Sequence, residues 1–111
     1  MEIREERKDG VLVLGLVGRL DATNSKLFED KILATIDGGE KQLVIDLSKL
    51  EYISSSGLRV FLLASKRLNP AGGKVVLCSL KEPVRQVFEI AGFSSILPIR
   101  NSQEEALKSL Q

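Results

Sequence analysis

The chain has 111 residues, of which 43% are hydrophobic and 28% are charged, and its formal net charge is +1. This length predicts a single domain, residues 1–111, with one hydrophobic core. The near-neutral charge and the five aromatic residues argue against nucleic-acid binding, which needs a basic surface or stacking platforms.

The N-terminus is charged and leads into a hairpin pattern. Residues 1–6 lack the apolar core of a signal peptide, and no apolar run reaches the length of a membrane span. We therefore expect a soluble, cytoplasmic protein without a membrane partner. Residues 2–8 and the apolar strand 11–17 flank Asp9-Gly10, a hairpin signal, so these two strands are expected to be antiparallel.

A turn at residues 18–21 precedes the first predicted helix, which stops at Asp37-Gly38-Gly39. Its apolar residues recur at helical spacing: Leu27, Phe28, Ile32, Leu33 and Ile36. A strand at 43–47 follows, and then a turn of three serines, Ser54, Ser55 and Ser56. The second helix is expected from about Ser56 to Leu68, before a break at 69–73.

The C-terminal third continues the alternation of strands and helices. A strand at 74–78 ends in Cys78, which we interpret as a core residue rather than a reactive thiol. A third helix ends at Gly92, and a short last strand is expected at 96–99. Residues 102–105 match a capping box and start a terminal helix. The inward residues expected in these two helices are Val84, Val87, Phe88, Ala91, Ala106, Leu107 and Leu110.

The predicted order is therefore β-β-α-β-α-β-α-β-α. Alternation of strands and helices after an N-terminal hairpin indicates an α/β fold. Its sheet is expected to be mixed and mostly parallel, with an antiparallel N-terminal hairpin and four helices.

The sequence offers little catalytic machinery. There is no histidine, which removes the commonest general base and any Ser-His-Asp triad, and no cysteine cluster that could hold a metal. Glycine-rich nucleotide motifs are also absent. We expect a protein that is not an enzyme and that has no cofactor, metal site or catalytic residue.

Two carboxylates lie near predicted strand ends, Asp21 and Asp46. Ligand sites of α/β sheets lie at the carboxyl ends of strands, so both acids and the serine turn could share one rim. That rim could serve a small ligand-binding module, or Asp46 could be the phosphorylated aspartate of a receiver-like signalling domain. Alternatively, Asp21 caps the first helix and Asp46 bonds to nearby backbone.

The serine turn carries the clearest functional signal. Three hydroxyls lie where a strand meets a helix N-terminus, a place suited to an N-cap or a phosphorylated side chain. One cap needs one hydroxyl, which leaves others free for modification. A phosphate adds about −1.5 to −2 charges, so it could abolish a protein contact while the domain stays folded.

The chain resembles the anti-sigma factor antagonists of the STAS family over nearly its whole length. The matching segments are Gly18-Arg19-Leu20-Asp21, residues 43–48, Tyr52-Ile53-Ser54-Ser55-Ser56-Gly57-Leu58, residues 72–77 and residues 84–93. The resemblance implies partner switching: the unmodified antagonist binds an anti-sigma factor serine kinase, which frees the sigma factor. The kinase then phosphorylates the antagonist and releases it, and a serine phosphatase resets it.

The resemblance also implies which residues act. The family phosphoacceptor is the serine after an aspartate, which matches Ser55 here, with Ser54 in the place of the aspartate and Ser56 in that of the next small residue. Ser54 and Ser56 are the alternative phosphorylation sites. Arg59 adds a cation close to the phosphate position. The partner-binding residues implied are Asp21, Thr23, Asn24, Ser54, Ser56, Gly57, Leu58 and Arg59.

Overall fold

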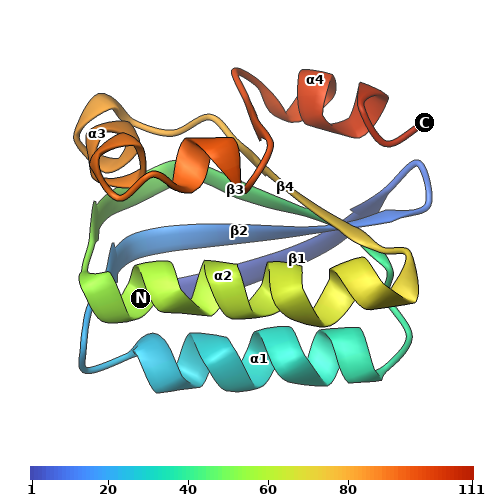
Figure 1. The fold of residues 1–111 in the computed structure, drawn as a ribbon, viewed down its shortest axis with the longest axis horizontal. Helices are drawn as coiled ribbons and strands as arrows, with labels where there is room; N and C mark the ends of the chain where they lie inside the picture. Colours follow the sequence, from blue (N-terminus) through green and yellow to red (C-terminus); the bar gives the residue numbers. More distant parts are fainter.

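A computed structural model describes all residues, 1–111, and contains one five-stranded sheet in the order β1-β2-β3-β4-β5 (Figure 1). The elements are β1 (Glu2–Lys8), β2 (Val11–Leu20), α1 (Ser25–Asp37), β3 (Gln42–Ile53), α2 (Ser55–Leu68), β4 (Lys74–Cys78), α3 (Glu82–Ile90), β5 (Ile99–Arg100) and α4 (Gln103–Lys108), with short 3-10 helices η1 (Asn69–Ala71) and η2 (Phe93–Ser95).

Only the β1–β2 pair is antiparallel, and the other three strand pairs are parallel. The predicted α/β class, the N-terminal hairpin and the four helices are therefore confirmed. No helix combines the length and the apolar character needed to cross a membrane.

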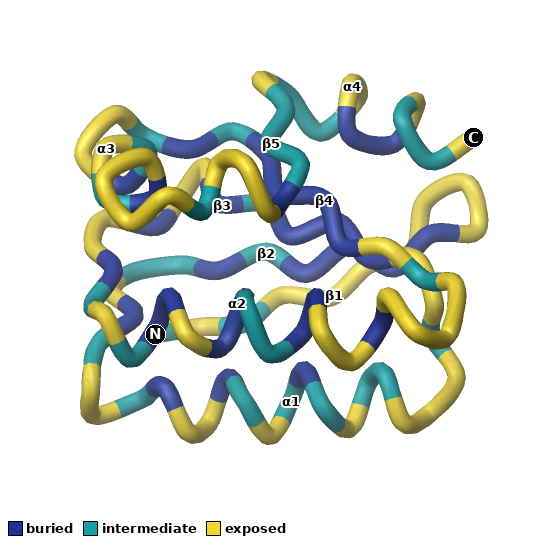
Figure 2. Tube along the Cα trace, in the orientation of Figure 1, coloured by how far each residue is buried: buried dark blue, intermediate teal, exposed yellow.

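The helices cover the two faces of the sheet unequally. Helices α1, α2 and α3 bury the larger core. Within it the rings of Phe28, Phe61 and Phe88 pack in tilted and edge-to-face contacts, with centroids 5.3 and 5.4 Å apart. On the other face, Ala106 and Leu107 of α4 pack on a smaller cluster of strand residues. Figure 2 shows the central strands buried between these layers, whereas β1 is exposed along most of its length.

Strand β3 is longer than the sequence predicts, and its extra length positions the serine turn. Its register against β2 shifts twice, between Asp46 and Lys49 and between Leu50 and Tyr52. Each shift is a bulge that adds one residue, so the buried side chains change from spacing of two to spacing of three, at Leu47, Leu50 and Ile53. Because the alternation of apolar and polar residues stops at Leu47, the sequence predicted that the strand ends there.

Three further expectations are wrong in detail. Leu27 lies on the exposed side of α1 with 60% of its surface accessible, and Ala91 is exposed just beyond the end of α3. The last strand is Ile99–Arg100 rather than 96–99, because η2 occupies the preceding residues and leaves Ile96 half exposed.

In α4 the capping serine is confirmed, since Ser102 Oγ accepts a hydrogen bond from the amide of Glu105 at 3.1 Å.

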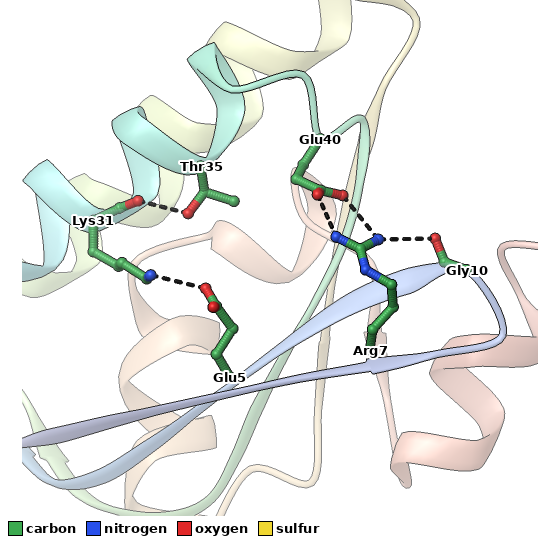
Figure 3. Close-up of polar contacts among 6 residues, drawn as sticks. All are labelled: Glu5, Arg7, Gly10, Lys31, Thr35 and Glu40. Carbon is green, nitrogen blue, oxygen red and sulfur yellow. Dashed lines mark hydrogen bonds and ion pairs between the residues drawn. The ribbon is translucent and has the colours of Figure 1, made fainter.

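Ion pairs connect the exposed strand β1 to the segment around α1 (Figure 3). Lys31 Nζ lies 2.8 Å from a carboxylate oxygen of Glu5, and Arg7 binds both carboxylate oxygens of Glu40. Exposed pairs of this kind add little stability. Their charges also line an edge strand, where charged side chains discourage pairing with another chain.

Candidate functional site

The serine turn joins the end of β3 to the start of α2. Ser54 is the N-cap of α2: its Oγ accepts a hydrogen bond from the amide of Gly57 at 3.2 Å. The amide of Ser54 donates to the carbonyl of Leu20 at 2.9 Å, which ties the turn to the end of β2. One of the three hydroxyls is therefore a helix cap, as a purely structural interpretation of the serines requires.

A chain of hydroxyl groups continues from this cap. Ser54 Oγ lies 2.9 Å from Ser56 Oγ, which lies 3.0 Å from Ser25 Oγ in α1, and Ser25 Oγ donates to the carbonyl oxygen of Asp21 at 2.6 Å. A hydroxyl has one proton to donate. Since Ser25 gives its proton to Asp21, Ser56 must donate to Ser25, and Ser54 must donate to Ser56. All three protons are thereby committed.

Ser55 differs from its two neighbours. It is exposed at the first position of α2, and its hydroxyl has no hydrogen-bond partner within the protein, while Ser54 and Ser56 are partly buried and bonded to each other. Ser25 in α1 adds a fourth hydroxyl to the three of the serine turn, and the sequence analysis did not identify it. Its partner Ser56 is 31 positions away, so no local pattern could have indicated it.

The β2–α1 loop forms a second self-contained unit beside the turn. Asp21 Oδ1 accepts hydrogen bonds from the amide and the hydroxyl of Thr23 at 3.0 and 2.6 Å. The Thr23 hydroxyl, followed by its amide, holds the pKa of Asp21 below its ordinary value. Asn24 is the N-cap of α1, but its side chain bonds to the amide of Asp21 and the carbonyl of Arg19. The Asp21 carboxylate thus shapes the loop and does not cap the helix amides.

Asp46 does not lie at the end of the sheet that carries Asp21 and the serine turn, although the sequence predicted that it would lie near a strand end. It lies in the middle of β3, seven residues before Ile53, on the sheet face that α4 partly covers. Its carboxylate accepts hydrogen bonds from the amide of Ser48 at 2.9 Å and from Gln103 Nε2 of α4 at 2.8 Å. Binding of Asp46 to nearby backbone is confirmed, and a joint site with Asp21 is wrong. No group of three or more potential metal-ligating residues occurs in the structure.

The model of one known family, the STAS domain, matches residues 2–106 of this chain. The chain belongs to the STAS domain family. BtrV of Bordetella bronchiseptica, named as a candidate anti-sigma factor antagonist, is 46% identical over 106 residues, which are 96% of this chain and 91% of BtrV. The anti-sigma F factor antagonist of Paenibacillus polymyxa is 30% identical over 112 residues, covering 100% of this chain and 96% of the relative.

Solved structures agree with this assignment. The crystal structure of an anti-sigma factor antagonist from Mycobacterium paratuberculosis has a TM-score of 0.89 and 26% identity to this STAS domain, covering 97% of this chain and 92% of that chain.

Two residues implied as partner contacts lie inside this STAS domain. A Cβ atom at Gly57 would lie 2.8 Å from Cγ of Leu20 and 3.1 Å from Cγ1 of Ile53, so glycine allows α2 to approach the sheet closely. Leu58 is 7% exposed and belongs to the larger core. The bare Gly57 backbone and the buried Leu58 side chain therefore support the turn from inside the domain.

The remaining implied contact residues line the accessible side of the serine turn. Thr23 and Arg59 are exposed, and Asp21, Asn24, Ser54 and Ser56 are partly exposed. The Arg59 guanidinium forms no ion pair or hydrogen bond within the domain, and Arg59 is four residues after Ser55 on α2. Residues four apart lie on the same side of a helix, so this cation is next to the free hydroxyl.

Proposed function

We propose that this STAS domain is an anti-sigma factor antagonist that works by partner switching as a single cytosolic domain without enzymatic activity of its own. Unmodified, it binds an anti-sigma factor serine kinase and so releases the sigma factor. The kinase phosphorylates Ser55, which ends the contact, and a serine phosphatase restores it. The names of the relatives, anti-sigma factor antagonists from several bacteria, support this role.

The observation that carries the proposal is the free hydroxyl of Ser55. The protons of Ser54, Ser56 and Ser25 are all used inside the domain, so a kinase that took any of these hydroxyls would first have to break that chain. Ser55 is exposed and costs no internal hydrogen bond to modify. This favours Ser55 over Ser54 and Ser56 as the phosphoacceptor.

The position also explains how a phosphate can act without unfolding the domain. At the first residue of α2, the added negative charge meets the positive end of the helix dipole and a nearby cation, Arg59. The fold therefore tolerates the phosphate. A partner surface that fits a neutral serine would have to bury about −1.5 to −2 charges, which is costly without a paired cation.

The test combines phosphosite mapping with binding. The protein is incubated with ATP and the anti-sigma factor kinase of the same organism, and the phosphate is located by fragment mass spectrometry. We expect modification of the wild type at Ser55 and none of Ser55→Ala, which still binds the kinase. Ser55→Asp should fold but lose binding. Wild-type affinity in Ser55→Asp, or phosphate found elsewhere, would contradict the proposed switch.

A further inference from the structure

A second exposed feature lies beside the serine turn, at the ends of β2 and β3. Arg19 and Tyr52 are directly paired in the sheet, and the Arg19 guanidinium lies 4.2 Å from the centre of the Tyr52 ring. Tyr52 is one of only four large hydrophobic residues with substantial exposure, with 42% of its surface accessible. The pair is therefore an exposed cation–π stack.

The Arg19 guanidinium has no hydrogen-bonded or ion-paired partner in the domain, and its charge contributes only a minor part of the lowered pKa of Asp21. Arg4, Arg7 and Arg67 each form an ion pair with a carboxylate, whereas the Arg19 side chain forms no hydrogen bond or ion pair. Stacking on the ring holds the planar group in place and leaves its N–H donors unused at the edge. A guanidinium presented this way matches the two oxygens of a carboxylate.

The stack adjoins the surface formed by the serine turn and the β2–α1 loop. Arg19 is two residues before Asp21, and its carbonyl accepts the Asn24 side-chain hydrogen bond. Tyr52 is two residues before Ser54, whose amide is bonded to Leu20. Figure 1 shows the ends of β2 and β3 gathered with the starts of α1 and α2 on one side of the molecule. A protein that covers the serine turn would thus reach Arg19 and Tyr52.

We propose that Arg19 and Tyr52 form an anchor site for an acidic side chain of the partner, with the carboxylate bound to the N–H edge of Arg19. This inference rests on the proposed function, because it names the chemistry by which the same partner is recognised. Arginine and tyrosine are enriched among interface residues that dominate binding energy. The ordered stack lowers the entropy lost when Arg19 binds, since its side chain is already held.

The test measures affinity for the anti-sigma factor kinase of the same organism, without ATP so that Ser55 stays unmodified. Arg19→Ala should weaken binding about 30-fold, the size expected for an interface hot spot. Arg19→Lys keeps the charge but loses the planar fork, so it should also weaken binding, by about tenfold. Tyr52→Phe keeps the ring and should stay within about twofold of wild type, whereas Tyr52→Ala should weaken binding by about fivefold.

Lys74→Ala is the matched control, because Lys74 is an exposed cation without an ion pair at the start of β4, the opposite end of the parallel strands. It should bind within about twofold of wild type. Circular dichroism checks that each variant folds. We expect the Arg19 variants to fold because the hydrogen bond from Asn24 to residue 19 uses its backbone carbonyl, which the substitutions keep. If Arg19→Ala binds like wild type while Ser55→Asp does not bind, the anchor is wrong and the switch stands. If Ser55→Asp binds like wild type, the switch itself is wrong.

Discussion

Ser25 and Ser56 lie on the first turns of different helices, and their hydroxyl oxygens are 3.0 Å apart. Through this contact the start of α1 and the start of α2 share one hydrogen-bonded chain, which runs from the cap Ser54 to the carbonyl of Asp21. The two loops that carry the candidate partner surface are thus joined by side chains rather than by backbone alone. Ser25 is 8% exposed, so this link is shielded from water.

Replacing Ser25 with alanine should therefore disturb both loops. We expect a loss of about 1 kcal/mol in the free energy of unfolding, because Ser56 keeps a proton without an acceptor. In a double-mutant cycle with Ser56→Ala, the two losses should not add, since both remove the same contact. Urea denaturation measures the cycle, and hydrogen exchange should show faster exchange at the amide of Gly57. Ser65→Ala is the control, because buried Ser65 bonds to Asn69 at the far end of α2. Additive losses would contradict the shared chain.

Gly57→Ala should be destabilising by about 1–3 kcal/mol, the range for an overpacked core. The new methyl group would lie 2.8 Å from Leu20 Cγ and push α2 away from the sheet. Gly15→Ala in β2 is the control, because a Cβ there meets nothing closer than 3.9 Å. That variant should be neutral or stabilised by up to about 1 kcal/mol, since alanine loses less backbone entropy than glycine. Equal effects of the two substitutions on the denaturation midpoint would show that close packing at Gly57 is unimportant.

Thr23→Ala should raise the pKa of Asp21 toward its ordinary value, because the Thr23 hydroxyl is the main cause of the lowered pKa. Thr23→Ser, which keeps the hydroxyl, should leave the pKa low. Since the folded pKa lies below the unfolded one of about 3.9, the stabilising effect of ionised Asp21 is complete above that pH and is lost as the pH falls through the folded pKa. A carboxyl-carbon NMR titration measures the pKa directly. The explanation fails if Thr23→Ala titrates like the wild type.

Cys78 should be inert toward thiol reagents in the folded protein. Burial, with a smaller contribution from the negative charge of Asp46, raises the pKa of its thiol to about 11. At pH 8 only about one thiol in a thousand is then ionised, and the sulfur is also inaccessible. Labelling of the Cys78 thiol with a chromogenic aromatic disulfide should be slow in native buffer and complete in denaturant. Rapid labelling of the native protein would contradict a buried Cys78.

Much of the site could be predicted from sequence because its signals are local. Serines before an apolar helix indicate an N-cap, and the Ser54 hydroxyl does accept the Gly57 amide. The capping serine of α4, the hairpin at Asp9-Gly10 and the buried Cys78 were predicted for the same reason. Where a strand contains bulges the local pattern fails, since two-residue alternation cannot represent an inserted residue, and β3 was ended six residues early at Leu47.

The sequence by itself determined the order of the elements, the α/β class and the place of the serine turn, because apolar periodicity and turn residues act over a few positions. Only the tertiary structure decided which serine hydroxyl is free. That choice depends on Ser25, brought to Ser56 by the packing of α1 against α2, and on the proton that Ser25 gives to Asp21. The tertiary structure also separated Asp46 from Asp21. The sheet face on which a side chain lies depends on the strand register, and its distance from the end of the sheet depends on where the strand ends.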